Sequence, residues 1–314
     1  MNIGEQTAAR SMSARKIGGY GAAVAVAPYL LVKIAWTAGL VLPDRKMGEP
    51  AWRAINATTA VLALVAVLLA LAFSQPWGER IPAWSVVTPV WIGTGLLVPM
   101  VLLAPVLAPA AVLRNRAAGA TTTWSIEQIL VVVSLLGVGL GLPIALVGYA
   151  RARWPEALAG PTGRPERPGG VRQLAATTGR LTAVGCVLLG ATNTYWALGG
   201  TLGLDPARLS GRDLWWHLLT LSTGVWALAG AWGIRGLATR RGSGRFPLPM
   251  LISWVASGML FSYNLFSALR ADSAANPEYP LARVLSTEAG IVAGLLMLVT
   301  ILIIVAERRR KPGN

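Results

Sequence analysis

Lys33, Glu127 and Glu288 are charged residues placed inside long apolar segments of the chain. Insertion scales put a lysine at the centre of a membrane helix at about 2.5 to 3.5 kcal/mol, so such groups normally face a bundle interior or a wet cavity and pair with one another. At ~1.5 Å of rise per residue, Lys33 stands about 13 Å and Glu288 about 12 Å below the same membrane surface, with Glu127 at an equivalent or slightly shallower place. We therefore expect Lys33 to form an ion pair with Glu127 or Glu288.

A carboxylate beside an ammonium can bind an ionic or zwitterionic solute or pass a proton. In an enzyme the carboxylate would act as general acid or base and the ammonium would stabilise a developing anion, chemistry that suits a lipid or isoprenoid substrate. A structural pair that fixes helix register explains the same residues, because polar contacts between membrane helices are worth only about 0.6 to 2 kcal/mol. The residues alone leave these interpretations open, and any catalytic residue stays unknown.

Five further residues are candidates for binding a solute or ion in the same cavity: Trp36, Asn193, Trp196, His217 and Asn264. Asn193 takes the place of Lys33 in the second half of the chain, and each of these two is followed three residues later by one of the two tryptophans. Asn264 belongs to a polar run in mid-membrane. His217 stands beside tryptophans at the predicted end of a span, where interfacial anchoring is the competing explanation.

Membrane helices must hold these residues. Hydrophobic residues make up 54% of the chain and charged residues 13%, with a mean hydropathy of +0.56, which excludes a soluble globular protein. Crossing a bilayer takes roughly 20 apolar residues per helix, and the cost of unpaired backbone groups in lipid favours helices over irregular chain. We count eight such segments, at residues 17–42, 54–75, 82–107, 126–150, 177–200, 214–236, 247–269 and 282–306.

The chain reads as one four-helix membrane unit written twice. Trp124-Ser125-Ile126-Glu127 and Leu285-Ser286-Thr287-Glu288 open the last span of each half, and their glutamates stand 161 positions apart. Matches at the other spans keep the same order, with offsets of 160, 164 and 165 residues. Four spans return the chain to its starting side, so the halves point the same way, as in parallel repeats. We predict two four-helix bundles, at residues 1–150 and 177–314, joined by a Pro, Gly and Arg-rich linker at 151–176.

The run Tyr195-Trp196-Ala197-Leu198-Gly199-Gly200 resembles the signature of a family of short, uncharacterised bacterial four-helix membrane proteins. The resemblance covers the second half well, whereas the first half keeps only Trp36 and Gly39 of the run. It implies four helices per unit and a tandem arrangement of two units in this chain. The family carries no assigned reaction, so the resemblance implies no catalytic residues.

The net charge of +15 is better explained by membrane topology than by nucleic-acid binding. With eight spans, the side shared by the two termini carries 18 of the 28 Lys and Arg residues, and the opposite loops carry nine. The positive-inside rule therefore predicts a multi-pass protein of the bacterial plasma membrane with both termini in the cytoplasm. Membrane lipid is the expected partner of the basic loops, and no nucleic acid is expected.

Three function classes fit these observations. A carrier would bind a small solute, or couple it to protons, in a polar cavity in the outer half of the protein. A non-catalytic membrane subunit or assembly factor would bind another membrane protein, and an enzyme would act on a lipid or isoprenoid. With one cysteine and one histidine, the chain offers no disulfide relay, no haem held by several histidines and no zinc site of common composition, so no cofactor or metal is expected.

Overall fold

The computed structural model describes residues 3–40, 50–117, 126–154, 170–239, 247–269 and 277–309. These stretches are helical apart from short connections and one isolated β-bridge, between Leu204 and Glu278. Within the described residues, seven helices are long and apolar enough to cross a membrane. The chain is therefore an all-α integral membrane protein. Most of the expected linker, at residues 155–169, and Ser125 of the first Ser-x-Glu element lie outside the described residues.

The chain divides into two compact units. The first comprises residues 1–89 and 109–155, and the second comprises residues 90–108 and 156–314. One boundary between the units falls at residue 155, inside the expected linker, and residues 90–108 group with the second unit. These residues belong to α3 (Ala83–Ala117), a single unbroken helix of 35 residues that contains Pro89, Pro99 and Pro105.

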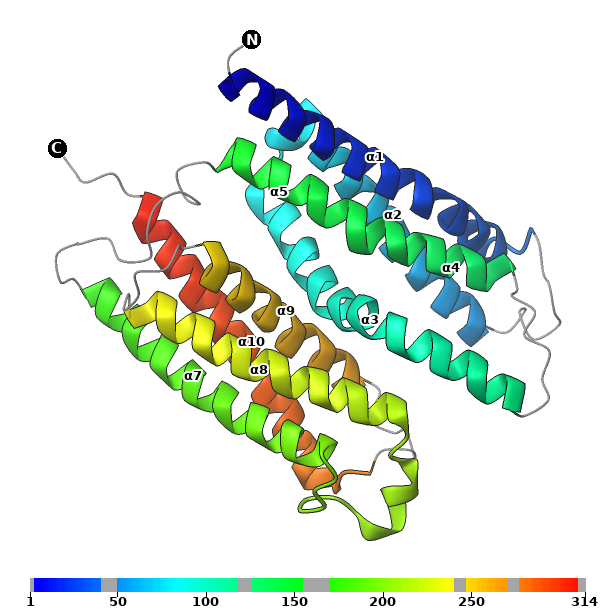
Figure 1. Cartoon of the computed structure of the whole chain (residues 1–314), viewed down its shortest axis with the longest axis vertical. Coiled ribbons are helices and arrows are strands. Elements are labelled where there is room, and N and C mark those ends of the chain that lie inside the picture. The colour runs from blue at the N-terminus through cyan, green and yellow to red at the C-terminus, as the bar shows by residue number, and fades with distance from the viewer. Residues whose placement is uncertain are drawn as a thin grey trace. The chain divides into compact units, whose positions relative to one another are not determined.

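In the first unit, three rods of helix lie side by side (Figure 1). They are α1 (Ile3–Thr37), α2 (Pro50–Ser74), and a third rod in which α4 (Ile126–Leu136), the π-helical turn η3 (Gly137–Gly141) and α5 (Leu142–Arg153) follow one another without a break. The short helix η2 (Pro76–Glu79) connects α2 to α3. The sequence did not predict the π turn.

The second unit contains four long helices that run side by side (Figure 1): α7 (Gly170–Ala197), α8 (Leu214–Thr239), α9 (Pro247–Leu269) and α10 (Pro280–Arg309). The short helix η4 (Pro206–Gly211) lies in the connection between α7 and α8. Although α8 has 26 residues, it is not among the seven helices that are apolar enough to be counted as spans. The total of eight spans therefore stays a prediction.

The first and fifth expected segments end earlier in the structure than the hydropathy indicated. Helix α1 ends at Thr37 rather than at residue 42, and α7 ends at Ala197 rather than at residue 200. Gly39 and Gly199 follow these ends with positive φ angles of 74° and 105°. Glycine commonly terminates a helix in this conformation, because residues with a Cβ are strained at positive φ. Hydropathy carries no information about the φ angle at a helix end.

Glycine and alanine bring the helices of each unit close together. In the first unit, a Cβ added at Gly141 would lie 2.6 Å from the Gly18 carbonyl oxygen, and one at Gly137 would lie 2.5 Å from the Ala25 Cβ. In the second, a Cβ at Gly294 would lie 2.7 Å from the Ser257 carbonyl oxygen. In lipid no hydrophobic driving force holds helices together. Membrane helices therefore associate through close van der Waals packing, which small residues permit.

Residues 90–108 of α3 pack against α9 within the second unit. The Trp91 indole Nε1 donates a hydrogen bond of 2.8 Å to Ser257 Oγ, and its ring stacks on Phe261 at a centroid distance of 4.6 Å. A Cβ at Gly95 would collide with the backbone of Gly258. This close crossing explains why the middle of α3 belongs to the second unit.

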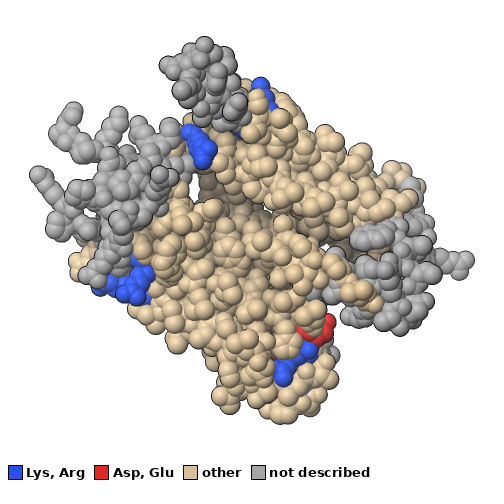
Figure 2. Space-filling view, viewed as in Figure 1, with Lys and Arg blue, Asp and Glu red and all other residues tan. Residues whose placement is uncertain are grey.

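The described surface is dominated by apolar side chains along the helices. Leu31, Leu181 and Leu188 are 65%, 66% and 65% exposed, although each lies well inside a long helix. On the face shown in Figure 2, the Lys, Arg, Asp and Glu side chains of the described residues cover only small areas. An apolar surface of this extent requires lipid around it.

Candidate functional site

Lys33 and Glu127 form an ion pair at the end of the first unit where α1 ends and α2 and α4 begin. Lys33 Nζ lies 2.7 Å from Glu127 Oε1 and donates a second hydrogen bond of 2.8 Å to Asn56 Oδ1. Lys33 is only 6% exposed, whereas the Glu127 side chain is 42% exposed. Of the two glutamates that the sequence offered to Lys33, the structure pairs it with Glu127.

Local structure holds both partners of the lysine in place. Glu127 is the second residue of α4, where the unpaired amides of the first helical turn favour a carboxylate. The Asn56 amide nitrogen donates to the Trp52 carbonyl oxygen at 2.8 Å, one turn earlier in α2, which turns Oδ1 toward Lys33. Asn56 is 2% exposed, so this amide oxygen is available only to the buried ammonium.

Aromatic rings complete the surroundings of the Lys33 ammonium. Nζ lies 4.5 Å from the centroid of the Trp36 ring and 5.3 Å from that of Tyr29, both within cation–π range. Trp52 packs on Trp36 at 5.5 Å. Two of the three N–H groups of the ammonium donate hydrogen bonds to the oxygens of Glu127 and Asn56. The aromatic rings lie around the rest of the ammonium.

The group of this site that can still accept a hydrogen bond is the Glu127 carboxylate. Glu127 accepts from Lys33 through Oε1, and within the described part of the chain no group bonds to Oε2. A half-exposed carboxylate oxygen that is held next to a neutralising buried cation can accept one more donor from outside.

The corresponding polar residues of the second unit are not gathered into a matching site. The Asn193 amide nitrogen donates to the Leu189 carbonyl oxygen of its own helix at 2.9 Å, and that of Asn264 donates to the Leu260 carbonyl oxygen at 2.7 Å. Glu288 is exposed on α10, and no ion pair to it is found among the described residues. Within the first unit, the structure brings together Lys33, Trp36 and Glu127.

Trp196 and His217 have contacts that stabilise the connection after α7. The Trp196 indole donates to the Leu202 carbonyl oxygen at 2.7 Å. His217 Nδ1 lies 2.8 Å from the Ala197 carbonyl oxygen, so Nδ1 must carry a hydrogen in this contact, because a carbonyl only accepts. These contacts close the end of the helix and favour a structural role for both residues.

The Tyr-Trp-Ala-Leu-Gly-Gly run folds this same connection. The Tyr195 hydroxyl accepts hydrogen bonds from the amides of Thr201 and Leu202 at 3.2 and 3.3 Å. Its ring lies where a Cβ at Gly200 would be, so a side chain at that glycine would collide with it. The segment is also joined to the connection before α10: Asp205 donates its amide to Pro277, and Tyr279 donates its amide to Gly203, at 2.8 and 3.0 Å.

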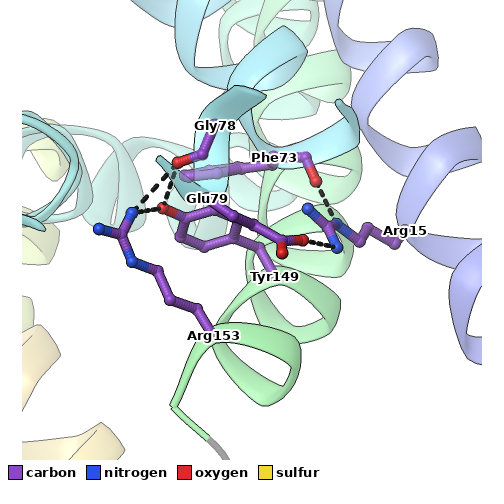
Figure 3. Close-up of polar contacts among 6 residues, drawn as sticks. All are labelled: Arg15, Phe73, Gly78, Glu79, Tyr149 and Arg153. Carbon is purple, nitrogen blue, oxygen red and sulfur yellow. Dashed lines mark hydrogen bonds and ion pairs between the residues drawn. The ribbon is translucent and has the colours of Figure 1, made fainter. Parts of the chain in front are cut away.

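A second polar cluster lies at the opposite end of the first unit, where α2 and α5 end (Figure 3). Arg15 Nη1 forms a 2.7 Å ion pair with Glu79, and Arg15 Nε donates to the Phe73 carbonyl oxygen. The Tyr149 hydroxyl donates to the Gly78 carbonyl oxygen at 2.9 Å. Tyr149 is fully buried and Arg15 is 4% exposed, so the cluster belongs to the interior of the unit.

Arg153 joins the same cluster from the last turn of α5 (Figure 3). It donates to the Gly78 carbonyl oxygen at 3.1 Å and to the Tyr149 hydroxyl, as Figure 3 shows. A third hydrogen bond of 2.5 Å goes to the Ile81 carbonyl oxygen. Together, Arg15 and Arg153 bond carbonyl groups that the end of α2 and the following turn leave without helical partners. The cluster therefore holds the connection between α2 and α3 against α1 and α5.

Sequence reasoning missed both this cluster and Asn56. Arg15 and Arg153 belong to the basic residues that indicate a membrane side, and their positions in the sequence do not show that both bond the connection between α2 and α3. Asn56 stands near the start of a span, where a polar residue is unremarkable. Its spacing of four residues from Trp52 was the one available signal, since that spacing places both on one face of a helix.

Among the described residues, no group of three His, Cys, Asp or Glu is arranged to hold a metal ion. No protein-family model, no curated protein and no solved structure matches the chain.

Proposed function

We propose that this integral membrane protein carries a small cation or a proton across the membrane and that Glu127 is the group that accepts it. The observation that carries the proposal is the half-exposed carboxylate of Glu127 beside the buried ammonium of Lys33. A carboxylate beside a buried cation in a membrane helix can accept a further positive charge, and intramembrane ionisable residues commonly mark ion and proton pathways.

An anionic or zwitterionic solute has less support. To bind a solute carboxylate, Lys33 would need a free N–H group that solvent can reach. Its ammonium is instead buried and donates to Glu127 and Asn56, with aromatic rings around the remainder. The open coordination position is on the carboxylate, and the carried species is therefore cationic.

The proposal includes a topology. Eight spans with α8 as the sixth, two parallel four-helix repeats and cytoplasmic termini would place Glu127 near the outer surface and the Arg15 cluster near the cytoplasmic one. The excess of basic residues on the side of the termini supports this orientation. A cation would then enter from outside at Glu127.

The second candidate function is a non-catalytic subunit that binds another membrane protein. Its support is the folded connection after α7, where Tyr195, Trp196 and the bridge from Leu204 to Glu278 order a stretch of chain outside the helices. Ordered connections often carry binding residues. Purification after mild solubilisation would yield one stoichiometric partner if this alternative were correct.

A liposome assay tests the carrier proposal, and the repeat supplies a matched control. Purified protein is reconstituted into vesicles that contain a pH-sensitive dye. Acidification of the vesicle interior is then followed after an outward ion gradient is imposed. Glu127→Gln should lower the rate about tenfold or more, because a hydrogen bond to a charged group is worth ~1.5 to 3 kcal/mol. Glu288→Gln changes an exposed carboxylate at the corresponding position and should leave the rate unaltered. Equal rates for wild type and Glu127→Gln would refute the proposal.

A further inference from the structure

We infer that the cation accepted at Glu127 is a primary alkylammonium compound, and that Lys33 occupies the site as a tethered version of this ligand. The inference rests on the proposed function and names its substrate class. Lys33 is itself an alkylammonium group, and its surroundings show directly which chemistry the site satisfies. A carboxylate oxygen lies 2.7 Å from Nζ, an amide oxygen 2.8 Å away, and two aromatic faces lie within 5.3 Å.

These groups discriminate between an ammonium and a metal ion. A bound calcium ion takes six to eight oxygen ligands and magnesium about six, several of them waters. Only two side-chain oxygens approach Lys33 Nζ in the described part of the chain, and the remaining surroundings are the rings of Trp36 and Tyr29. Aromatic faces attract organic ammonium ions and replace water around them. A primary ammonium, with its N–H donors, matches the two oxygens and the rings together.

The exposures of the three polar residues suggest an order of events. Asn56 and Lys33 are 2% and 6% exposed, whereas the Glu127 side chain is 42% exposed. An incoming ammonium therefore meets the carboxylate first, at Oε2. Occupation of the inner position by the ligand requires Lys33 Nζ to leave Glu127 and Asn56. One cation replaces another, so the carboxylate never remains without a positive partner.

Removal of the lysine should therefore create a binding site. Lys33→Ala leaves the Glu127 carboxylate, the Asn56 oxygen and the Trp36 face without their cation. n-Propylammonium has the length to fill the vacated space, and n-propanol serves as its neutral counterpart. Because ligand bound only to the folded state raises the unfolding temperature, binding is measured by thermal unfolding of the purified full-length chain in nanodiscs.

We expect n-propylammonium to raise the unfolding temperature of Lys33→Ala, while n-propanol and sodium chloride do not. Its affinity for the variant should exceed that for the wild type by about tenfold or more, because the wild-type lysine competes for the site. Lys33→Ala/Glu127→Gln should show no such rise. If Lys33→Ala does not fold, Lys33→Asn provides the same test, since asparagine stands at the equivalent position of the second half at Asn193.

Two results would overturn the inference: equal stabilisation by sodium and n-propylammonium, or undiminished binding to the double variant. The outcome is separable from that of the proposed function. Glu127-dependent proton flux without alkylammonium binding would refute the ligand class and leave the carrier. Alkylammonium binding without flux in liposomes would refute the carrier and leave the site.

Discussion

Gly39 and Gly199 end their helices in the same way, 160 residues apart. The amide of each donates to the carbonyl oxygen of the tryptophan three residues earlier, Trp36 or Trp196, at 3.1 Å in both cases. The next residue, Leu40 or Gly200, donates at 2.9 Å to the carbonyl oxygen five residues before it, again in both. This agreement in backbone hydrogen bonding supports the proposal that the two halves are copies.

A packing contact shows the same correspondence. A Cβ at Gly19 would collide with Ser74 of α2, and a Cβ at Gly179 would collide with Ala238 of α8. The two glycines are separated by 160 residues and their partners by 164, the same offsets that the sequence shows for the first two spans of each half. The helix pairs α1–α2 and α7–α8 therefore cross at corresponding points.

Replacement of Gly39 by alanine should destabilise the first unit. A residue with a Cβ in the left-handed region costs about 1 to 2 kcal/mol, and Gly39 has a φ of 74°. The matched control is Gly21→Ala in α1, where a Cβ meets no atom within 4 Å and alanine favours the helix. Thermal unfolding in detergent should show a lower transition for Gly39→Ala and an equal or higher one for Gly21→Ala. Equal losses would contradict the role of the positive φ.

The Asn56 amide should matter to stability far more than the Asn193 amide. Asn56→Leu removes an oxygen from the buried ammonium of Lys33 and should cost about 1 to 3 kcal/mol. Among the described residues, Asn193 bonds only the Leu189 carbonyl oxygen of its own helix, so Asn193→Leu should change stability by less than about 0.5 kcal/mol. Chemical unfolding of the two variants provides the comparison. A larger loss for Asn193→Leu would show that the polar site lies in the second unit instead.

Tyr149 and Arg153 should act together on the connection between α2 and α3. Tyr149→Phe removes the hydrogen bond to the Gly78 carbonyl oxygen and should cost about 1 kcal/mol, and Arg153→Ala should cost more because three donations are lost. Since the two side chains also bond each other, the double variant should lose less than the sum of the single losses. Additive losses, measured by the same unfolding assay, would mean that the residues act independently.

The proposed orientation can be tested with single cysteines. In a Cys186→Ala background, Ser210→Cys in the connection after α7 and Ala152→Cys at the end of α5 introduce exposed thiols. A membrane-impermeant maleimide added to intact cells should label position 210 and not position 152. Labelling of position 152 alone would reverse the orientation, and labelling of both would contradict the number of spans between them.

The sequence was informative where a charge stands in an apolar segment. The cost of an unpaired lysine in lipid predicts that Lys33 has an acidic partner, and the shared depth of the glutamates reduced the choice to two. Hydropathy also located the long helices well, with α9 found at its expected residues 247–269. The choice between Glu127 and Glu288 required three-dimensional information, because both carboxylates stand at equivalent positions in similar sequence.

Other features left no mark in hydropathy or charge. The π turn at Gly137–Gly141 depends on how closely the glycines approach α1, which composition alone does not specify. The bonds from Arg15 and Arg153 to backbone carbonyl groups depend on where α2 ends, and a helix end is set by local geometry. Asn193 was expected to replace Lys33 in a polar layer, but an amide satisfies its donors on its own helix at little cost.

The backbone hydrogen bonds that join residues 203–205 to 277–279 can form only late in biosynthesis. Synthesis and membrane insertion proceed from the amino terminus, so Gly203 and Asp205 emerge well before their partners Pro277 and Tyr279. The loop after α7 therefore lacks these hydrogen bonds until the segment before α10 has been synthesised. A chain truncated before that helix would display an unfinished loop, which quality-control proteases could distinguish from the completed protein.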